Sequence, residues 1–213
     1  MEKELTHHFA DINGIRLHYV SAGRGPMILF VHGFPEFWRA WADQLRTFGN
    51  QYQAVALDMR GYNLSSKPGE PDSYRATALI DDLIGLADHL GHERFFLAGH
   101  DWGGAVCWSL AARHPERLKK LIILNAPHPA IFARELLGNP DQQQASAYMR
   151  LFRSPEAEAV LSRNNFQDLI SVMFSQWGSK WEASKEVIEQ YVSAWSQPGA
   201  LTHASSHNPG LVV

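Results

Sequence analysis

A short turn at residues 99–103, with the sequence GHDWG, has the composition of a site for covalent catalysis. It follows an apolar run typical of a buried strand and precedes Gly104 and Ala105, two small residues that suit the start of a closely packed helix. A strand, a glycine-containing turn and a helix in this order form a nucleophile elbow, which presents a reactive side chain at the carboxyl end of a sheet. Asp101 occupies the reactive position. An isolated G-x-D-x-G pattern would instead favour an aspartate that caps the following helix.

The segment HGFPE at residues 32–36 also favours catalysis, because it directly follows the apolar run 27–31. In hydrolases with a nucleophile elbow, the loop at this place supplies one backbone amide of an oxyanion hole, and the residue after the nucleophile supplies the other. We therefore predict that the amides of Phe34 and Trp102 form the oxyanion hole, and that both residues contact the substrate. A plain Gly-Pro loop after a strand is the alternative.

A third segment, DMRGY at residues 58–62, follows the apolar run 53–57. We interpret it as a structural turn with an internal ion pair between its acidic and basic residues. Asp58 is therefore not assigned a catalytic role.

The elements that must position these motifs alternate between strand and helix. Residues 7–22 are expected to form two strands around Asn13 and Gly14, since Asn-Gly is a strong hairpin signal. Further strands are predicted for the apolar runs 27–31, 53–57, 94–98 and 121–124, and helices for residues 38–48, 77–90 and 104–113. Thr77 is the expected N-cap of the second helix, and Gly91 its stop. This alternation predicts a mostly parallel, doubly wound α/β sheet.

After residue 128 the pattern becomes entirely helical. Helical periodicity covers residues 131–137, 140–153, 155–175 and 183–196. We predict an α/β core of six strands at residues 1–128, a helical cap at residues 129–200, and an irregular, polar tail at residues 201–213.

Charge and cysteine content limit the partners. The chain of 213 residues has a formal net charge of −3 and no long basic run, which argues against nucleic acid or an anionic membrane as a partner. Cys107 is the single cysteine, so no intrachain disulfide can form. No segment approaches the roughly 18 apolar residues of a membrane span. We expect a cytoplasmic protein.

The segments HGFPEFWRAW, ALDMRGYNLSSKP, AGHDWGGAVCW and LNAPHP, in this order and spacing, resemble the epoxide hydrolase branch of the α/β-hydrolases. The haloalkane and haloacetate dehalogenases are relatives of that branch, and the resemblance runs from about residue 8 to about residue 201. It implies a small-molecule epoxide or halogenated substrate and no metal or organic cofactor. A carboxylate can displace an epoxide oxygen at saturated carbon, which gives an alkyl ester of Asp101 that water then hydrolyses to a diol.

The resemblance also implies roles for two residues in or beside the cap. Tyr148 lies where the first cap tyrosine of this family is expected, and would donate a hydrogen bond to the epoxide oxygen. Its alternative is an ordinary half-buried helix tyrosine. His128, in the motif LNAPHP, is interpreted as structural, with substrate contact as its other role.

In the family, two more strands follow the cap, and the loops after them carry the catalytic acid and the histidine base. This chain ends before either, so we expect a C-terminally truncated protein that lacks its last core strands, its base and its acid. His203 and His207 could act as the base only if the tail folds back. Asn125 stands where some dehalogenases carry the acid and cannot replace it. His32 and His100 are interpreted as structural.

Two consequences follow from this expected loss. The strand at 121–124 should be a bare, apolar edge through which the chain could pair with another chain. The chain should also complete at most the first half-reaction and keep an alkylated Asp101.

Two other functions stay open: a dehalogenase, for which Trp102 would hold the halide, and an inactive remnant. A serine esterase is disfavoured because no serine occupies the elbow.

Overall fold

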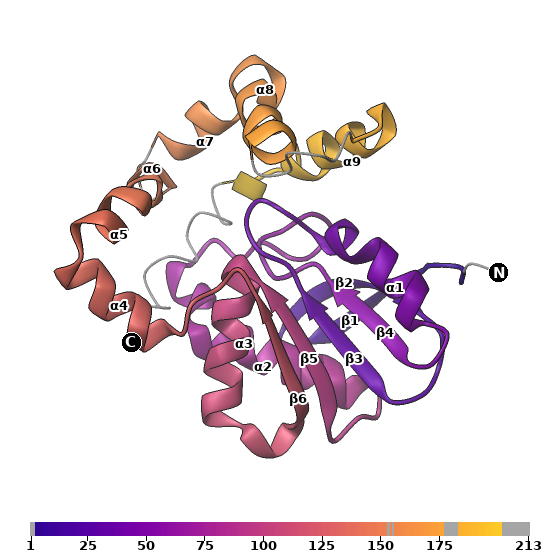
Figure 1. Cartoon of the computed structure of the whole chain (residues 1–213). Helices are drawn as coiled ribbons and strands as arrows, with labels where there is room; N and C mark the ends of the chain where they lie inside the picture. Colours follow the sequence, from indigo (N-terminus) through magenta and orange to yellow (C-terminus); the bar gives the residue numbers. More distant parts are fainter. Residues whose placement is uncertain (1–2, 153, 155, 177–182, 202–213) are drawn as a thin grey trace.

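The structure is a computed structural model that describes residues 3–152, 154, 156–176 and 183–201. Its core is a six-stranded sheet with the strand order β1-β2-β4-β3-β5-β6 (Figure 1). The strands are β1 Thr6–Ile12, β2 Ile15–Ala22, β3 Met27–Val31, β4 Gln53–Leu57, β5 Phe95–His100 and β6 Leu118–Leu124. β1 pairs with β2 and β2 with β4 in antiparallel fashion, whereas β4, β3, β5 and β6 are parallel. The predicted α/β sheet is confirmed.

The middle of the sheet is buried on both faces, and its central strand β3 is apolar and buried at every position. In β3, Leu29 and Val31 belong to one core cluster, and Ile28 and Phe30 belong to the other. The first cluster packs against α2 (Ala76–His89) and α3 (Asp101–Arg113), and the second packs against the turn of 3₁₀ helix η1 (Trp38–Trp41) and α1 (Ala42–Phe48). The sheet is therefore covered on both sides, as a doubly wound fold requires.

The hairpin prediction is also confirmed. Asn13 and Gly14, with φ of 52° and 75°, connect β1 to β2, because both residues tolerate the left-handed conformation that a tight hairpin turn needs. Two short 3₁₀ turns complete the core: η2 at Pro71–Tyr74 and η3 at Pro115–Arg117.

Several predicted boundaries differ from the structure, and three of the differences have a clear physical cause. The N-cap of α2 is Arg75, which is extended, and Thr77 lies inside the first turn. α3 begins at Asp101 itself, three residues earlier than predicted. β6 begins at Leu118, because Lys119 and Lys120 can point into solvent at the end of the sheet while their backbone continues the ladder with β5.

Helices occupy the rest of the described chain, and no strand occurs between residue 129 and residue 201 where the structure describes them. Their bounds are α4 Pro129–Gly138, α5 Pro140–Ala145, α6 Tyr148–Phe152, α7 Ala157–Leu161, α8 Arg163–Ser171, the π-helical turn η4 Val172–Gln176, and α9 Lys185–Trp195. The helix predicted at 140–153 is broken between α5 and α6. Figure 1 shows α4 to α9 as an arc beyond the carboxyl ends of the parallel strands.

The end of this segment differs from the sequence prediction by one residue. Leu201, expected to open the irregular tail, has helical backbone and is buried in the core. Residues 202–213, and with them His203 and His207, lie outside the described residues. None of the helices that the structure describes is long and apolar enough to cross a membrane.

Candidate active site

Asp101 stands at the carboxyl end of β5, where the chain turns directly into α3. Its φ of 51° is in the left-handed region, which an aspartate tolerates better than most residues. The turn fits only because Gly103 lacks a side chain: a Cβ there would lie 2.3 Å from the carbonyl oxygen of His32. The strand–turn–helix context therefore holds the Asp101 carboxylate against the loop that follows β3.

Two backbone amides contact this carboxylate. The amide of Phe34 donates to Oδ1 of Asp101 at 3.0 Å, and the amide of Trp102 also donates to the carboxylate. Burial raises the pKa of Asp101, and the two amide hydrogen bonds only partly oppose that rise. The two amides predicted to form an oxyanion hole thus meet at a single carboxylate, where they could stabilise negative charge that develops on its oxygen.

The loop that carries Phe34 is held from three sides. The fully buried His32 contacts the carbonyl of Gly33 through Nδ1 at 2.8 Å, and its Nε2 accepts the amide of Met59 at 3.1 Å. Burial lowers the pKa of His32, which keeps Nε2 free to accept. From the helical segment, the indole of Trp195 donates to the carbonyl of Pro35 at 2.6 Å. His32 thus has the structural role that the sequence analysis gave it.

Two cavities meet at Asp101. The first, of about 270 Å³, lies between α3 and the helices α4 to α6, and it is mainly apolar. The second, of about 470 Å³, lies under α9 and the turn η4. Asp101, Asn125 and Tyr148 line both cavities. The first cavity adds Trp102, Phe132 and Met149, and the second adds Glu36, His100 and Tyr191, among others.

Tyr148 is brought to Asp101 as the sequence analysis predicts. It begins α6, is 48% exposed, and lines both cavities together with Asp101. Burial and the negative charge of Asp101 both raise the pKa of Tyr148, so the phenol keeps its proton and can donate it in a hydrogen bond.

His128 is not brought to the site, since it lines neither cavity. Its Nδ1 accepts the amide of Ala130 at the start of α4, and its ring packs edge-on against Trp108 with centroids 5.0 Å apart. These contacts support the structural interpretation of His128 and not the substrate contact.

The structure adds a polar pair that the sequence analysis does not place in the site. Nδ1 of His100 lies 3.0 Å from Oε2 of Glu36, and both residues line the second cavity with Asp101. The hydrogen bond to Glu36 raises the pKa of His100. Nε2 of His100 faces the amide nitrogen of Asn125 at 3.4 Å. Two sequence signals were present: His100 directly precedes Asp101, and Glu36 lies two residues after Phe34 in HGFPE.

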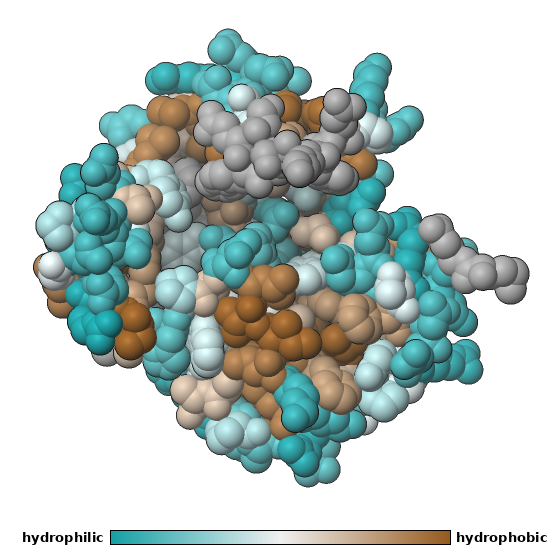
Figure 2. Space-filling view, viewed as in Figure 1, coloured by the Kyte–Doolittle hydropathy of each residue, from teal (hydrophilic) through white to brown (hydrophobic). Residues whose placement is uncertain are grey.

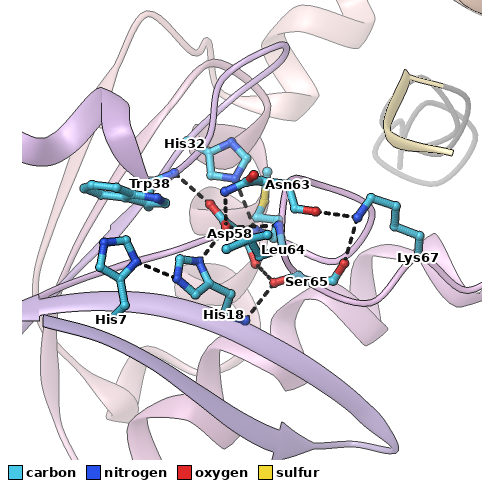
Figure 3. Close-up of polar contacts among 10 residues, drawn as sticks. His7, His18, His32, Trp38, Asp58, Asn63, Leu64, Ser65 and Lys67 are labelled. Carbon is cyan, nitrogen blue, oxygen red and sulfur yellow. Dashed lines mark hydrogen bonds and ion pairs between the residues drawn. The ribbon is translucent and has the colours of Figure 1, made fainter. Parts of the chain in front are cut away.

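The prediction of an ion pair within the segment DMRGY is wrong. Arg60 forms a two-pronged pair with Asp82 on α2, through contacts of 2.6 Å from Nε and Nη2. Asp58 instead pairs with His18 on β2 at 2.6 Å (Figure 3). Antiparallel pairing of β2 with β4 sets Tyr19 opposite Leu57, so the next residues along, His18 and Asp58, also become neighbours.

In the part of the chain that the structure describes, no three His, Cys, Asp or Glu side chains are grouped so that they could hold a metal ion.

Comparisons with known proteins agree with this fold. Residues 26–163 match the family model described as the alpha/beta hydrolase fold, and the chain belongs to that family. It is 42% identical over 211 residues to epoxide hydrolase 4 of Mus musculus, covering 95% of this chain and 59% of that protein. It is also 42% identical over 197 residues to the AB hydrolase superfamily protein YfhM of Bacillus subtilis (strain 168), covering 91% of this chain and 69% of that protein.

Solved structures give the same result. An epoxide hydrolase from Bacillus megaterium, in complex with an inhibitor, superposes with a TM-score of 0.86 at 38% identity, covering 93% of this chain and 71% of that one. The chain therefore resembles epoxide hydrolases in sequence and in fold, and it spans about 59% of the length of the mouse relative.

Proposed function

We propose that this chain is a hydrolase of the epoxide hydrolase type, in which Asp101 opens an epoxide by forming an alkyl ester. The observation that carries the proposal is the Asp101 carboxylate itself. It accepts hydrogen bonds from the backbone amides of Phe34 and Trp102. Together with Tyr148, it lines a largely apolar cavity. The epoxide hydrolases among its relatives support the choice of substrate class.

The first step needs a nucleophile and a hydrogen-bond donor on opposite sides of the ring. One carboxylate oxygen of Asp101 bonds to a ring carbon, the carbon–oxygen bond of the epoxide breaks, and the oxygen leaves with its electron pair. Tyr148 donates a hydrogen bond to that oxygen, which ends as a hydroxyl after taking up a proton. The product is a hydroxyalkyl ester of Asp101.

Hydrolysis of the ester needs a base for the attacking water. The amides of Phe34 and Trp102 would stabilise the oxyanion formed when water adds to the acyl carbon of Asp101. Among the described residues, His100 is the only histidine that lines either cavity. Its Nδ1 contacts Glu36, and Nε2, the nitrogen that would have to take the proton from water, faces the side-chain nitrogen of Asn125 at 3.4 Å instead. We infer that the chain as it stands forms the ester faster than it hydrolyses it.

The lining of the first cavity favours an epoxide with an aromatic substituent. Trp102, Phe132 and Met149 present apolar surface beside Asp101. A mutant of the Bacillus megaterium enzyme, with 37% identity and a TM-score of 0.86, has been solved with its product (R)-3-[1]naphthyloxy-propane-1,2-diol. We propose aryl and aryloxymethyl epoxides as the substrate class of this chain.

Intact-protein mass spectrometry after incubation with styrene oxide tests the proposal, with diol measured in parallel and Asp101→Asn as the control. A single adduct that requires Asp101 and persists would support ester formation without hydrolysis. Diol without an adduct would mean that a histidine, such as His100, His203 or His207, acts as the base and completes the cycle. Halide release from a haloalkane, with no reaction of the epoxide, would favour the dehalogenase. If folded protein gives no adduct, no diol and no halide, the interpretation as an inactive remnant is favoured.

We also propose that the free edge of β6 pairs with another chain. β6 ends the sheet, and none of the described strands pairs with its outer side. Ile122 and Leu124 are 45% and 41% exposed, and Figure 2 shows hydrophobic surface gathered over this strand. Light scattering should then give a mass above that of a monomer, and Ile122→Lys should lower it. A monomer at every concentration would refute the pairing.

A further inference from the structure

Asp58, directly after β4, is a fully buried carboxylate outside the two cavities. Its Oδ2 lies 2.6 Å from Nδ1 of His18 and 2.8 Å from the side-chain nitrogen of Asn63, and the amide of Leu64 approaches it at 3.4 Å. Its Oδ1 accepts the amide of Trp38 at 2.9 Å. Figure 3 shows these donors converging on the one carboxylate.

The network continues to the protein surface through a second histidine. Nε2 of His18 lies 2.9 Å from Nδ1 of His7, and the two rings stack with centroids 5.1 Å apart. His7 is on β1 and is exposed, and its ring also packs edge-on against Trp38. A chain of three side chains thus connects solvent to the buried carboxylate (Figure 3).

The same carboxylate anchors the loop that reaches Asp101. Residues 32–38 are held at one end by the amide of Met59, which donates to His32, and at the other end by Asp58, which accepts the amide of Trp38. Between these anchors lies Phe34, whose amide contacts the Asp101 carboxylate. The position of the Phe34 amide therefore depends on residues 58 and 59.

We propose that Asp58, His18 and His7 are positioning residues that hold the Phe34 amide against Asp101, and that uptake of a second proton by the His7–His18 pair releases this loop. The proposal rests on the function proposed above, because it assigns the loop a role in the chemistry of Asp101.

The proton dependence follows from the His7–His18 contact. A hydrogen bond between two ring nitrogens needs a hydrogen on one of them and a lone pair on the other. The bond survives if one ring is an imidazolium but not if both are. The charged and titratable groups that act on His7 are its partner His18, Asp58 from the end of β4 and His8 from β1. Asp58 also acts on Lys67 and on His32.

The electrostatics agree in direction with this geometry. Partial burial, and then the nearby His18, lower the pKa of His7 even though its side chain reaches solvent, while Asp58 partly opposes them. His7 is therefore harder to protonate while residues 32–38 keep the position seen in the structure than after this loop has moved away. Opening should become more favourable as the pH falls from the ordinary pKa of histidine towards the lowered pKa of His7.

Amide hydrogen exchange, resolved by NMR, tests the proposal without requiring turnover. After correction for intrinsic rates, exchange of the Trp38 and Phe34 amides should accelerate by up to about tenfold per pH unit over this interval in the wild type. His7→Gln keeps a neutral hydrogen-bonding group and should abolish the acceleration. His8→Gln is the matched control, since His8 is the next residue on β1, contacts Ser21, stacks on Tyr19 and has the weakest of the electrostatic effects on His7.

The rate of adduct formation by Asp101 is measured on the same samples. A loss of rate at acidic pH that is relieved in His7→Gln, but not in His8→Gln, would support the proposal. Wild-type exchange at Trp38 and Phe34 that does not change with pH, or that changes equally in His7→Gln, would refute it. Acceleration confined to this loop and abolished by His7→Gln, with no adduct in any variant, would support the positioning role and refute the proposed function.

Discussion

The backbone amide of Phe34 donates to Oδ1 of Asp101 across 3.0 Å, although 67 positions separate the two residues in sequence. The contact follows from the sheet, because β3 and β5 are parallel neighbours with Val31 opposite Gly99. The loop after β3 and the turn after β5 therefore emerge side by side. Little space separates them: a Cβ on Gly33 would lie 2.4 Å from Cβ and from Oδ1 of Asp101.

Substitution Gly33→Ala should push the loop away from Asp101. We expect a loss of stability of about 1–3 kcal/mol, as for other overpacked sites, together with slower adduct formation. Gly69→Ala is the matched control, because a Cβ at Gly69 meets nothing within 4 Å. Chemical denaturation and mass spectrometry measure the two effects. Equal stability of the two variants would contradict the close contact.

Substitution Asp101→Asn should abolish adduct formation and also stabilise the fold. Burial raises the pKa of Asp101, so the ionised carboxylate opposes folding at neutral pH and a neutral amide does not. We expect a gain of roughly 1 kcal/mol at pH 7 that shrinks as the pH falls and the wild-type carboxyl takes up its proton. Thermal unfolding of both proteins across pH checks this, with the exposed Asp11→Asn as the control. A gain that does not depend on pH would count against the assigned cause.

Substitution Tyr148→Phe should slow ester formation without weakening the fold. Loss of the donor to the leaving oxygen is expected to cost about a hundredfold in rate, within the usual range for general acids. Since Tyr148 is 48% exposed, the stability should change by less than about 0.5 kcal/mol. Tyr52→Phe, in an aromatic cluster with Phe48 and Phe96, is the control. Equal rates in the two variants would leave Tyr148 as an ordinary helix tyrosine.

Substitution Glu36→Gln should lower the pKa of His100, because the hydrogen bond to Glu36 is the main cause of its rise. A raised histidine pKa stabilises the fold fully below the unfolded value of 6.5, and this contribution is lost as the pH rises through the folded value. The variant should therefore lose more stability at pH 6 than at pH 9. NMR titration of the His100 ring measures the pKa directly, and an unchanged value would show that another group sets it.

Much of the fold could be predicted from local pattern. The apolar runs of β3 and β4 and the Asn13-Gly14 turn each carry their signal within a few residues. The start of α2 could not be predicted, because the extended backbone of Arg75 fixes it without any side-chain cap, while Thr77 offers a misleading hydroxyl.

The site was predictable where one segment carries both the residue and its context, as at Asp101. Contacts between distant segments were not. Glu36 and His100 lie 64 positions apart and meet only because β3 and β5 are adjacent. Arg60 is two residues from Asp58 in sequence, yet the two do not pair. The pairing of β2 with β4 places Asp58 against His18, and Arg60 pairs with Asp82 instead.

The strand order also determines when the sheet can form during synthesis on the ribosome. β3 lies between β4 and β5, and both of its neighbours come later in the chain. Because translation proceeds at roughly 5–20 residues per second, several seconds pass between the synthesis of β3 and that of β5. During that interval β3 is an apolar strand with at least one unpaired edge, so the nascent chain is exposed to aggregation before the residues around Asp101 are made.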